Sequence, residues 1–247
     1  MQSASSRFWP YLLLALASLL GAVSLALFLI FLLGGPFVGI DLELGQAGAL
    51  GMDAALCLAF FVQHSSMIRT AFRRRSERFI PAPYHGAAYT MASGIVLLLL
   101  VVFWQDSDTV LVAVGGKGRW LLHGLVAIGA VGTMWGMLAL GALDGFGGDS
   151  IRAHLKGKPL PELPLSVSGP YRWVRHPLYL FMLFFIWSYP QLSADRLLFN
   201  LMFTAWIVIG SVLEERDLVA RFGADYRRYQ ARVPMLIPRT MRPAWPQ

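Results

Sequence analysis

Charged side chains are scarce in this chain. They make up 14% of its residues, against roughly 25% in a typical soluble domain, while hydrophobic residues make up 56%. Residues 8–33 carry no charge at all, and this run exceeds the roughly 20 apolar residues with which a helix crosses a bilayer. A secretory signal is the alternative interpretation, but its apolar region would span only about 7–15 residues. The scarcity of charge therefore excludes an ordinary soluble domain and predicts an integral membrane protein.

Cysteine is nearly absent as well, since Cys57 is the only one and lies inside an apolar segment. A single cysteine forms no intramolecular disulfide and no cysteine-based metal framework, so no metal site is predicted and Cys57 is interpreted as a small buried hydrophobe. No Gly-x-Gly-x-x-Gly follows a strand-like run, which excludes a Rossmann-type nucleotide site. Gly132 and Gly136 instead form a small-xxx-small pair, typical of close helix packing.

Further apolar segments predict additional membrane spans. The last of them is interrupted between Pro190 and Arg196, and each half is shorter than a typical span, which favours a tight helical hairpin with Asp195 and Arg196 at its turn. The sequence therefore predicts an all-α, polytopic transmembrane bundle of six spans, or five if the hairpin is re-entrant. We expect one integral membrane domain over 1–247, with the N-terminal spans in 1–143 and the cofactor-binding loop, hairpin and C-terminal helix in 144–247. The additional apolar segments are 48–68, 87–104, 120–143 and 178–213.

The net charge of +7 is compatible with nucleic-acid binding, but the distribution of lysine and arginine argues against it. The segments 69–78 and 144–177 and the tail after residue 214 are basic, whereas segments 34–47 and 105–118 together contain one lysine and four acids. This asymmetry follows the positive-inside rule. It predicts both termini in the cytoplasm and no nucleic-acid partner.

Polar and aromatic residues are concentrated in a predicted cytoplasmic segment just before the last apolar run. Residues 169–179 read Gly-Pro-Tyr-Arg-Trp-Val-Arg-His-Pro-Leu-Tyr. The two prolines, Pro170 and Pro177, predict a shaped loop that leads into a helix. The alternative is a set of membrane-surface arginines with an aromatic belt. That alternative explains the residue types but not their coincidence with two prolines and His176.

Two adjacent carboxylates, Glu214 and Glu215, stand where the last apolar run ends. Carboxylates at this depth are costly when dry and repel each other, so at least one should face water or a cation. Apolar side chains then recur at spacings of three and four and predict a C-terminal amphipathic helix, either on the membrane surface or packed against the protein. The members of this stripe are Leu218, Phe222, Tyr226, Tyr229 and Val233.

These segments together resemble the signature of the isoprenylcysteine carboxyl methyltransferase superfamily. That signature is the loop at 169–179, a helical hairpin, Glu-Glu, Phe-Gly-x-x-Tyr-x-x-Tyr at 222–229 and Val-Pro-x-x-Ile-Pro at 233–238. Residues 61–69 are similar to the bacterial branch that contains methanethiol S-methyltransferase and NnrU-like proteins. The chain departs from that branch's Asn-His pair after the fourth span, where it has Gly141 and Ala142. The bacterial branch implies an inner-membrane location.

The resemblance implies an S-adenosylmethionine-dependent methyltransferase with a cytoplasmic cofactor pocket. Arg172 or Arg175 would pair the cofactor carboxylate, and one of the two glutamates would bind its ammonium group. Aromatic side chains would face the adenine or the sulfonium, and His176 would bond the cofactor or hold the loop. The expected cofactor-binding residues are Tyr171, Arg172, Arg175, His176, Pro177, Tyr179, Glu214, Glu215 and Tyr226.

His64 is the candidate catalytic base, because a thiol reacts as its thiolate. It shares one face of the second apolar segment with Asp53 and Cys57, and polar residues within a span are functional candidates. The alternative is that His64 only hydrogen-bonds Gln63 or Ser65 at the interface. The expected acceptor is a small or lipid-soluble thiol such as methanethiol, in contact with membrane lipids. The alternatives are the carboxyl group of a prenylated cysteine, a phospholipid amine, or a non-catalytic NnrU-like protein. No oligomeric state is predicted.

Overall fold

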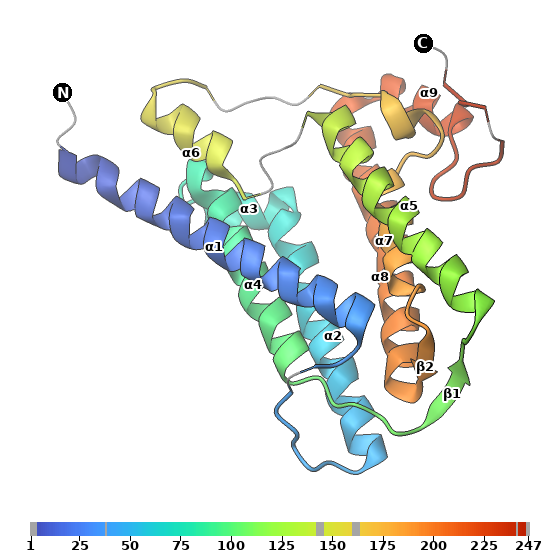
Figure 1. Cartoon of the computed structure of the whole chain (residues 1–247). Helices are drawn as coiled ribbons and strands as arrows, with labels where there is room; N and C mark the ends of the chain where they lie inside the picture. Colours follow the sequence, from blue (N-terminus) through green and yellow to red (C-terminus); the bar gives the residue numbers. More distant parts are fainter. Residues whose placement is uncertain (1–3, 38, 142–145, 160–163, 241, 246–247) are drawn as a thin grey trace. The chain divides into compact units, whose positions relative to one another are not determined.

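The computed structural model describes residues 4–37, 39–141, 146–159, 164–240 and 242–245, and most of this length is helical (Figure 1). The all-α expectation is confirmed. Five helical segments among the described residues are long and apolar enough to cross a membrane, so the protein is a polytopic helical membrane protein. They are α1 (Ala4–Gly34), α2 (Gln46–Ile68), α4 (His85–Val102) with the preceding turn η1 (Ala82–Tyr84), α5 (Lys117–Leu140) and α8 (Ala194–Phe222).

The chain forms two compact units, each described here by itself. The first covers residues 1–107 and 144–163, and the second covers 108–143 and 164–247. The expectation of one domain over 1–247 stays a prediction. Besides the segments above, the first unit contains α3 (Thr70–Ser76) and α6 (Gly148–Leu155). The second contains β1 (Val110–Ala113), η2 (Gly169–Arg172), α7 (Pro177–Ile186), β2 (Gln191–Ser193) and α9 (Ala224–Arg232).

In the first unit, α4 packs against both α1 and α2 (Figure 1). The absence of a side chain on Gly94 allows α1 to approach, since a Cβ there would lie 3.1 Å from the Leu20 side chain. The short helix α6 joins the same unit through Ile151, which is buried with Ala17 and Ala87. A continuous apolar contact therefore links α1, α4 and α6.

One polar contact in this unit ties the end of α4 to α2. Asp53 is fully buried in α2 and its Oδ1 accepts a hydrogen bond from the Gln105 backbone over 2.9 Å. The Gln105 side chain in turn donates to the carbonyls of Ile40 and Phe103 and accepts from the Leu42 backbone. Buried backbone groups require such partners. Asp53 is thus used to organise the loops that follow α1 and α4.

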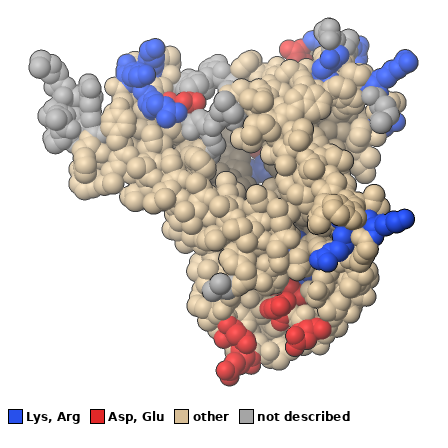
Figure 2. Space-filling view, viewed as in Figure 1, with Lys and Arg blue, Asp and Glu red and all other residues tan. Residues whose placement is uncertain are grey.

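Charges of opposite sign lie at opposite ends of the first unit. Figure 2 shows acidic side chains gathered over the loop between α1 and α2, and basic side chains over α6. Asp41 and Glu43 belong to that loop, while Arg152 and Lys156 belong to α6 and its C-terminal end. This separation is the one that the positive-inside rule describes.

In the second unit, α5 packs closely on α7 through glycines. A Cβ on Gly132 would lie 2.3 Å from the Phe181 ring, and one on Gly136 would lie 2.7 Å from the Leu178 side chain. Contacts this short leave no room for a methyl group. The close packing predicted from the small-xxx-small pair is therefore present, with α7 as the partner helix.

The predicted hairpin has unequal arms. The helix α7 has 10 residues, about 15 Å of rise against a hydrocarbon core of about 30 Å. The chain leaves α7 at Trp187 and forms β2, which pairs antiparallel with β1, before α8 begins. Asp195 and Arg196 lie in the first turn of α8 and not at the turn between the arms. Both are buried, and Arg196 Nη2 donates to the Ile186 carbonyl over 3.4 Å. Non-helical backbone at membrane depth needs hydrogen-bond partners of this kind. This need explains why Arg196 is buried at the start of α8 and does not lie at the turn.

The expected C-terminal amphipathic helix is divided in two. The first part is the end of α8, which continues through both carboxylates, and the second is α9. Gly223 separates them with φ +57°, a conformation that favours glycine. Tyr226, Tyr229 and Val233 form a buried cluster. The apolar stripe therefore packs against the protein, which decides between the two arrangements left open by its periodicity.

The α5–α7 contact predicts that alanine substitutions at two glycines of α5 change the stability of the protein differently. Gly132→Ala should destabilise the protein by about 1–3 kcal/mol, because its methyl group overlaps the Phe181 ring. Gly124→Ala is the matched control: nothing lies within 4 Å of its Cβ, and alanine favours a helix. Unfolding in detergent monitored by circular dichroism measures both. Equal midpoints for the two variants would contradict the packing.

Candidate active site

The loop that precedes α7 is anchored on the end of α5. Gly169 has φ +53°, and a Cβ there would lie 2.8 Å from Ala139 Cβ and 2.9 Å from Trp135 Nε1. Glycine is required on both counts. The Ser168 hydroxyl donates to the Ala139 carbonyl over 2.8 Å, and Trp135 makes an edge-to-face contact with Trp173 at 5.5 Å between ring centroids. The start of the loop is thereby fixed on the last turn of α5.

The second half of the loop is held by backbone hydrogen bonds to the segment that follows α9. The Arg175 backbone donates to the Pro234 carbonyl over 2.9 Å, and the His176 backbone donates to the Met235 carbonyl over 3.1 Å. Pro177, which is buried, is the first residue of α7, where a helix needs no N–H donor. Two segments of the predicted signature, far apart in sequence, are therefore adjacent.

The Arg175 side chain is the centre of the site. Its guanidinium forms two parallel bonds to Glu215, from Nε to Oε1 at 2.6 Å and from Nη2 to Oε2 at 3.1 Å. Its Nη1 donates to the carbonyls of Gln230, at 3.0 Å, and Val233. The Gln230 amide also donates to Glu215 Oε2 over 2.9 Å. Both charged side chains are only 11% exposed. Bidentate pairs of this kind are among the strongest side-chain hydrogen bonds.

His176 joins this pair to the second carboxylate. Its Nε2 lies 3.1 Å from Glu215 Oε1, and because an ionised carboxylate only accepts, Nε2 carries the proton. Its Nδ1 lies 3.8 Å from Glu214 Oε2, which also accepts from the Tyr179 hydroxyl over 2.9 Å. The rings of His176 and Tyr179 are stacked at 5.5 Å. The Glu214 side chain is 45% exposed, so this carboxylate is accessible to a ligand.

Arg172 and the C-terminal tail close one side of the loop. Arg172 Nε donates to the Trp245 carbonyl over 3.0 Å, and the Arg172 carbonyl accepts from the Ala244 backbone over 2.8 Å. Trp245 in turn contacts the ring of Tyr229 edge-on, at 5.7 Å between ring centroids. The tail thus links the loop to the cluster formed by α9.

Three buried tyrosines belong to the loop or to α9: Tyr171 lies in η2, and Tyr226 and Tyr229 lie in α9. The Tyr229 hydroxyl donates to the Tyr171 carbonyl, and Tyr226 is 1% exposed. Burial raises the pKa of all three hydroxyls above the usual value of about 10. They therefore remain neutral throughout the physiological range.

The structure brings most of the predicted cofactor-binding residues together. Arg175, His176, Tyr179, Glu214 and Glu215 form one cluster of hydrogen bonds, charge contacts and stacked rings, which we call the Arg175 cluster. Pro177 continues directly from it. Tyr171 and Tyr226 are buried. Their role in binding a cofactor stays a prediction.

Sequence reasoning missed several residues of this site. Gln230 and Trp245 contact Glu215 and Arg172, and Trp135 packs against the loop. Gln230 directly follows the Tyr-x-x-Tyr motif, a position that could have attracted attention. Trp135 and Trp245 carried no signal, since tryptophans near membrane boundaries are common.

His64 belongs to the first unit, four residues before the end of α2. It is half-buried, and the Tyr89 hydroxyl of α4 lies 2.8 Å from its Nε2 and 2.9 Å from its Nδ1. Beside it, Gln63 Nε2 donates to the Ser93 hydroxyl over 3.2 Å. Asp53 lies eleven residues earlier, about 16 Å along the helix. Tyr89 was not foreseen as a partner of His64.

The departure from the bacterial branch falls at the end of α5. Gly141 is the residue that ends this helix, with φ +64°, and Ala142 lies outside the described residues. The left-handed conformation suits glycine and closes the helix.

The fold and the Arg175 cluster define a class of protein: a helical membrane protein whose polar site is assembled from a loop, the end of a span and a C-terminal helix. No family model matches the chain. No solved structure matches it either.

Comparison with curated proteins identifies relatives. Methanethiol S-methyltransferase 2 of Bradyrhizobium diazoefficiens is 35% identical over 202 residues, covering 82% of this chain and 77% of the relative. A methanethiol S-methyltransferase of a Pseudomonas species is 38% identical over 225 residues, covering 87% and 84%. That of Mycobacterium tuberculosis is 33% identical over 196 residues, covering 79% and 80%. The chain belongs to the methanethiol S-methyltransferase family, in agreement with the resemblance of its motifs. It is a membrane-embedded methyltransferase.

The Arg175 cluster predicts unequal effects for its two carboxylates. Glu215→Gln should destabilise the protein by about 3 kcal/mol, because it leaves the Arg175 cation buried without a counter-charge. Glu214→Gln, at the half-exposed neighbour, is the matched control and should cost less than about 1 kcal/mol. Unfolding by denaturant in detergent measures both values. A loss at Glu214 as large as that at Glu215 would refute the central role of Arg175.

The buried tyrosines predict a loss of stability at alkaline pH. Their pKa values are raised in the folded protein, so their stabilising contribution is complete below the unfolded pKa of about 10 and falls as pH rises above it. Tyr226→Phe removes one of these groups, and its unfolding free energy should decline less steeply between about pH 9 and about pH 11. Parallel curves for the variant and the unmodified protein would exclude this linkage.

Proposed function

We propose that this protein transfers a methyl group from S-adenosylmethionine to a small thiol, with methanethiol as the acceptor. The observation that carries the proposal is the similarity over about 80% of the chain to bacterial proteins named methanethiol S-methyltransferase. The Arg175 cluster supports it, because it supplies a rigid polar site without a Rossmann domain.

The exposed part of the site suits the groups of the cofactor. Glu214 presents a half-exposed carboxylate beside Tyr179, which fits an ammonium group. Arg172 provides a cation for a carboxylate, and the ring of Tyr179, which stacks on the buried His176, offers an aromatic surface for a sulfonium. Arg175 and Glu215 are engaged with each other and serve to hold these groups. When bound, S-adenosylmethionine supplies an electrophilic methyl group on its sulfonium.

The acceptor thiol needs a base, and His64 is the residue we propose for it. A neutral imidazole has one donor and one acceptor nitrogen. One of these nitrogens accepts the thiol proton in our proposal, and Tyr89, whose hydroxyl lies 2.8 Å from Nε2 and 2.9 Å from Nδ1, is a positioning residue that holds the His64 ring. Removing that proton yields the thiolate, the nucleophilic form of the acceptor.

We further propose that the protein resides in a bacterial inner membrane with both termini in the cytoplasm. The charge asymmetry between its loops supports this orientation. It would place the basic segment at 69–78 and the Arg175 cluster on the cytoplasmic side, where the cofactor is available.

If His64 is the base, the loss of turnover on replacing it should depend on the acidity of the acceptor thiol. Purified protein with S-adenosylmethionine should convert methanethiol to dimethyl sulfide, measured by headspace gas chromatography. His64→Gln should lower turnover with methanethiol about 100-fold, a usual contribution of general base catalysis. The loss should be much smaller with an aromatic thiol, which is already ionised at neutral pH because its pKa lies below that of an alkyl thiol.

His123→Gln on α5 is the control and should leave turnover unchanged with both thiols. Equal losses for both thiols in His64→Gln would assign His64 a structural role. Methylation of a farnesylated cysteine analogue or of a phospholipid amine, without methylation of any small thiol, would overturn the proposed acceptor.

A further inference from the structure

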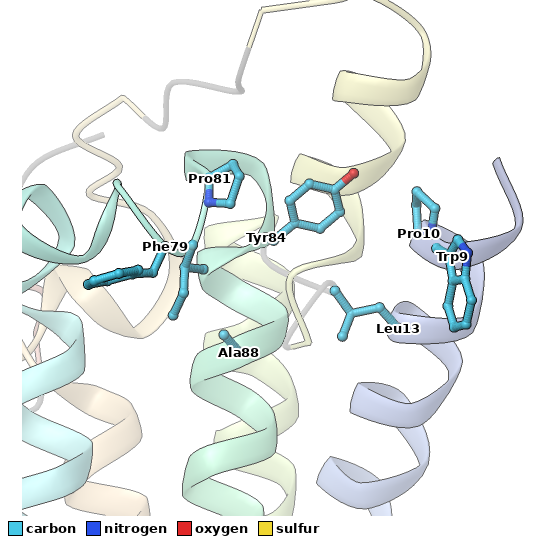
Figure 3. A pocket seen from close by; sticks show the side chains of 8 residues that line it. Trp9, Pro10, Leu13, Phe79, Pro81, Tyr84 and Ala88 are labelled. Carbon is cyan, nitrogen blue, oxygen red and sulfur yellow. The ribbon is translucent and has the colours of Figure 1, made fainter. Parts of the chain in front are cut away.

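An apolar groove lies in the first unit, and none of its lining residues is assigned to methyl transfer. It has a volume of about 460 Å³, within the range of ligand pockets. Its two walls come from the first turns of α1 and from the chain that leads into α4 (Figure 3). Trp9, Pro10 and Leu13 line one side, and Phe79, Pro81 and Tyr84 line the other.

The lining selects an apolar occupant. None of the residues that line the groove carries a charge, and their only polar side-chain atoms are the Tyr84 hydroxyl and the Trp9 indole nitrogen. A polar metabolite would lose its hydration there without finding partners. A hydrocarbon chain, by contrast, gains free energy from the same surface.

The groove lies at the boundary of two membrane spans. Trp9 and Pro10 stand at the start of the span Phe8–Gly34, and Pro81 and Tyr84 stand at the start of the span Ala82–Val102. Tryptophan and tyrosine are typical of the membrane interface, where their polar atoms meet the headgroups. Trp9 is 69% exposed. The groove is therefore open to lipid at the level where acyl chains join their headgroups.

The rim of the groove is positively charged. The Arg78 guanidinium lies 4.6 Å over the ring of Phe79, a lining residue. The adjoining α3 carries exposed Arg73, Arg74 and Arg75. Glu77 is the only acid in the segment 69–78. Juxtamembrane clusters of this composition attract anionic lipid headgroups.

We propose that this groove binds one acyl chain of an anionic phospholipid, with the phosphate of its headgroup on the arginines next to Phe79. The apolar lining suits the acyl chain, and the position of the groove at the membrane interface suits the junction between acyl chain and headgroup. Arg78 suits the negative charge of the headgroup. The site does not depend on the proposed acceptor or cofactor.

Native mass spectrometry of the full-length protein in detergent, titrated with phosphatidylglycerol or phosphatidylcholine, tests this site. We expect one phosphatidylglycerol to be retained more tightly than phosphatidylcholine. Ala88→Trp fills the groove and should weaken phosphatidylglycerol binding about tenfold. Arg78→Gln should weaken it about fivefold, as one interfacial charge predicts, and should leave phosphatidylcholine binding unchanged.

Two controls separate the groove from the general lipid belt. Leu99→Trp places the same indole side chain at an exposed position elsewhere on α4, and Arg119→Gln removes an exposed charge at the start of α5. Neither should change phosphatidylglycerol affinity. The proposal is overturned if Ala88→Trp binds phosphatidylglycerol as tightly as the unmodified protein. It is also overturned if both lipids bind equally and Arg78→Gln changes neither. Capture of a second copy of the chain in place of lipid would make the groove a dimer contact.

Discussion

The pairing of Arg175 with Glu215 is the interaction on which the second unit depends. A buried guanidinium is costly unless a counter-charge and hydrogen-bond acceptors surround it. Glu215 comes from α8, Gln230 from α9, and the carbonyl of Val233 from the segment beyond it. One side chain of the loop thus ties three later parts of the chain together. These contacts hold the loop against α8, α9 and the segment that follows α9.

The same pairing gives the two adjacent glutamates different roles. Glu215 accepts hydrogen bonds from Arg175, His176 and Gln230. Glu214 accepts one from Tyr179 and remains half-exposed. A dipeptide of identical residues therefore yields one structural carboxylate and one that can meet a ligand. Helical geometry explains the difference, since adjacent side chains point about 100° apart around the axis.

The hydrogen-bonding needs of backbone in a membrane shape the rest of the unit. The ten-residue helix α7 is shorter than the thickness of a bilayer, so its last carbonyls have no partner within the helix while still at membrane depth. Arg196 donates to the Ile186 carbonyl, and β1 pairs with β2. These contacts give hydrogen-bond partners to backbone groups of the non-helical chain between α7 and α8. Close packing of α5 on α7, permitted by Gly132 and Gly136, then holds this short helix in place.

The sequence by itself determined the membrane spans, the apolar stripe of the C-terminal helix and the five members of the Arg175 cluster. Hydropathy, periodicity and motif spacing are local properties, and each is legible from neighbouring residues. The tertiary structure alone decided that Arg175 is held by Glu215, that Tyr89 contacts His64, and that α7 stops at ten residues beside a pair of strands. The contacts among these features join residues 25 to 83 positions apart, and the pairing of one polar atom with another across such separations depends on how the helices pack.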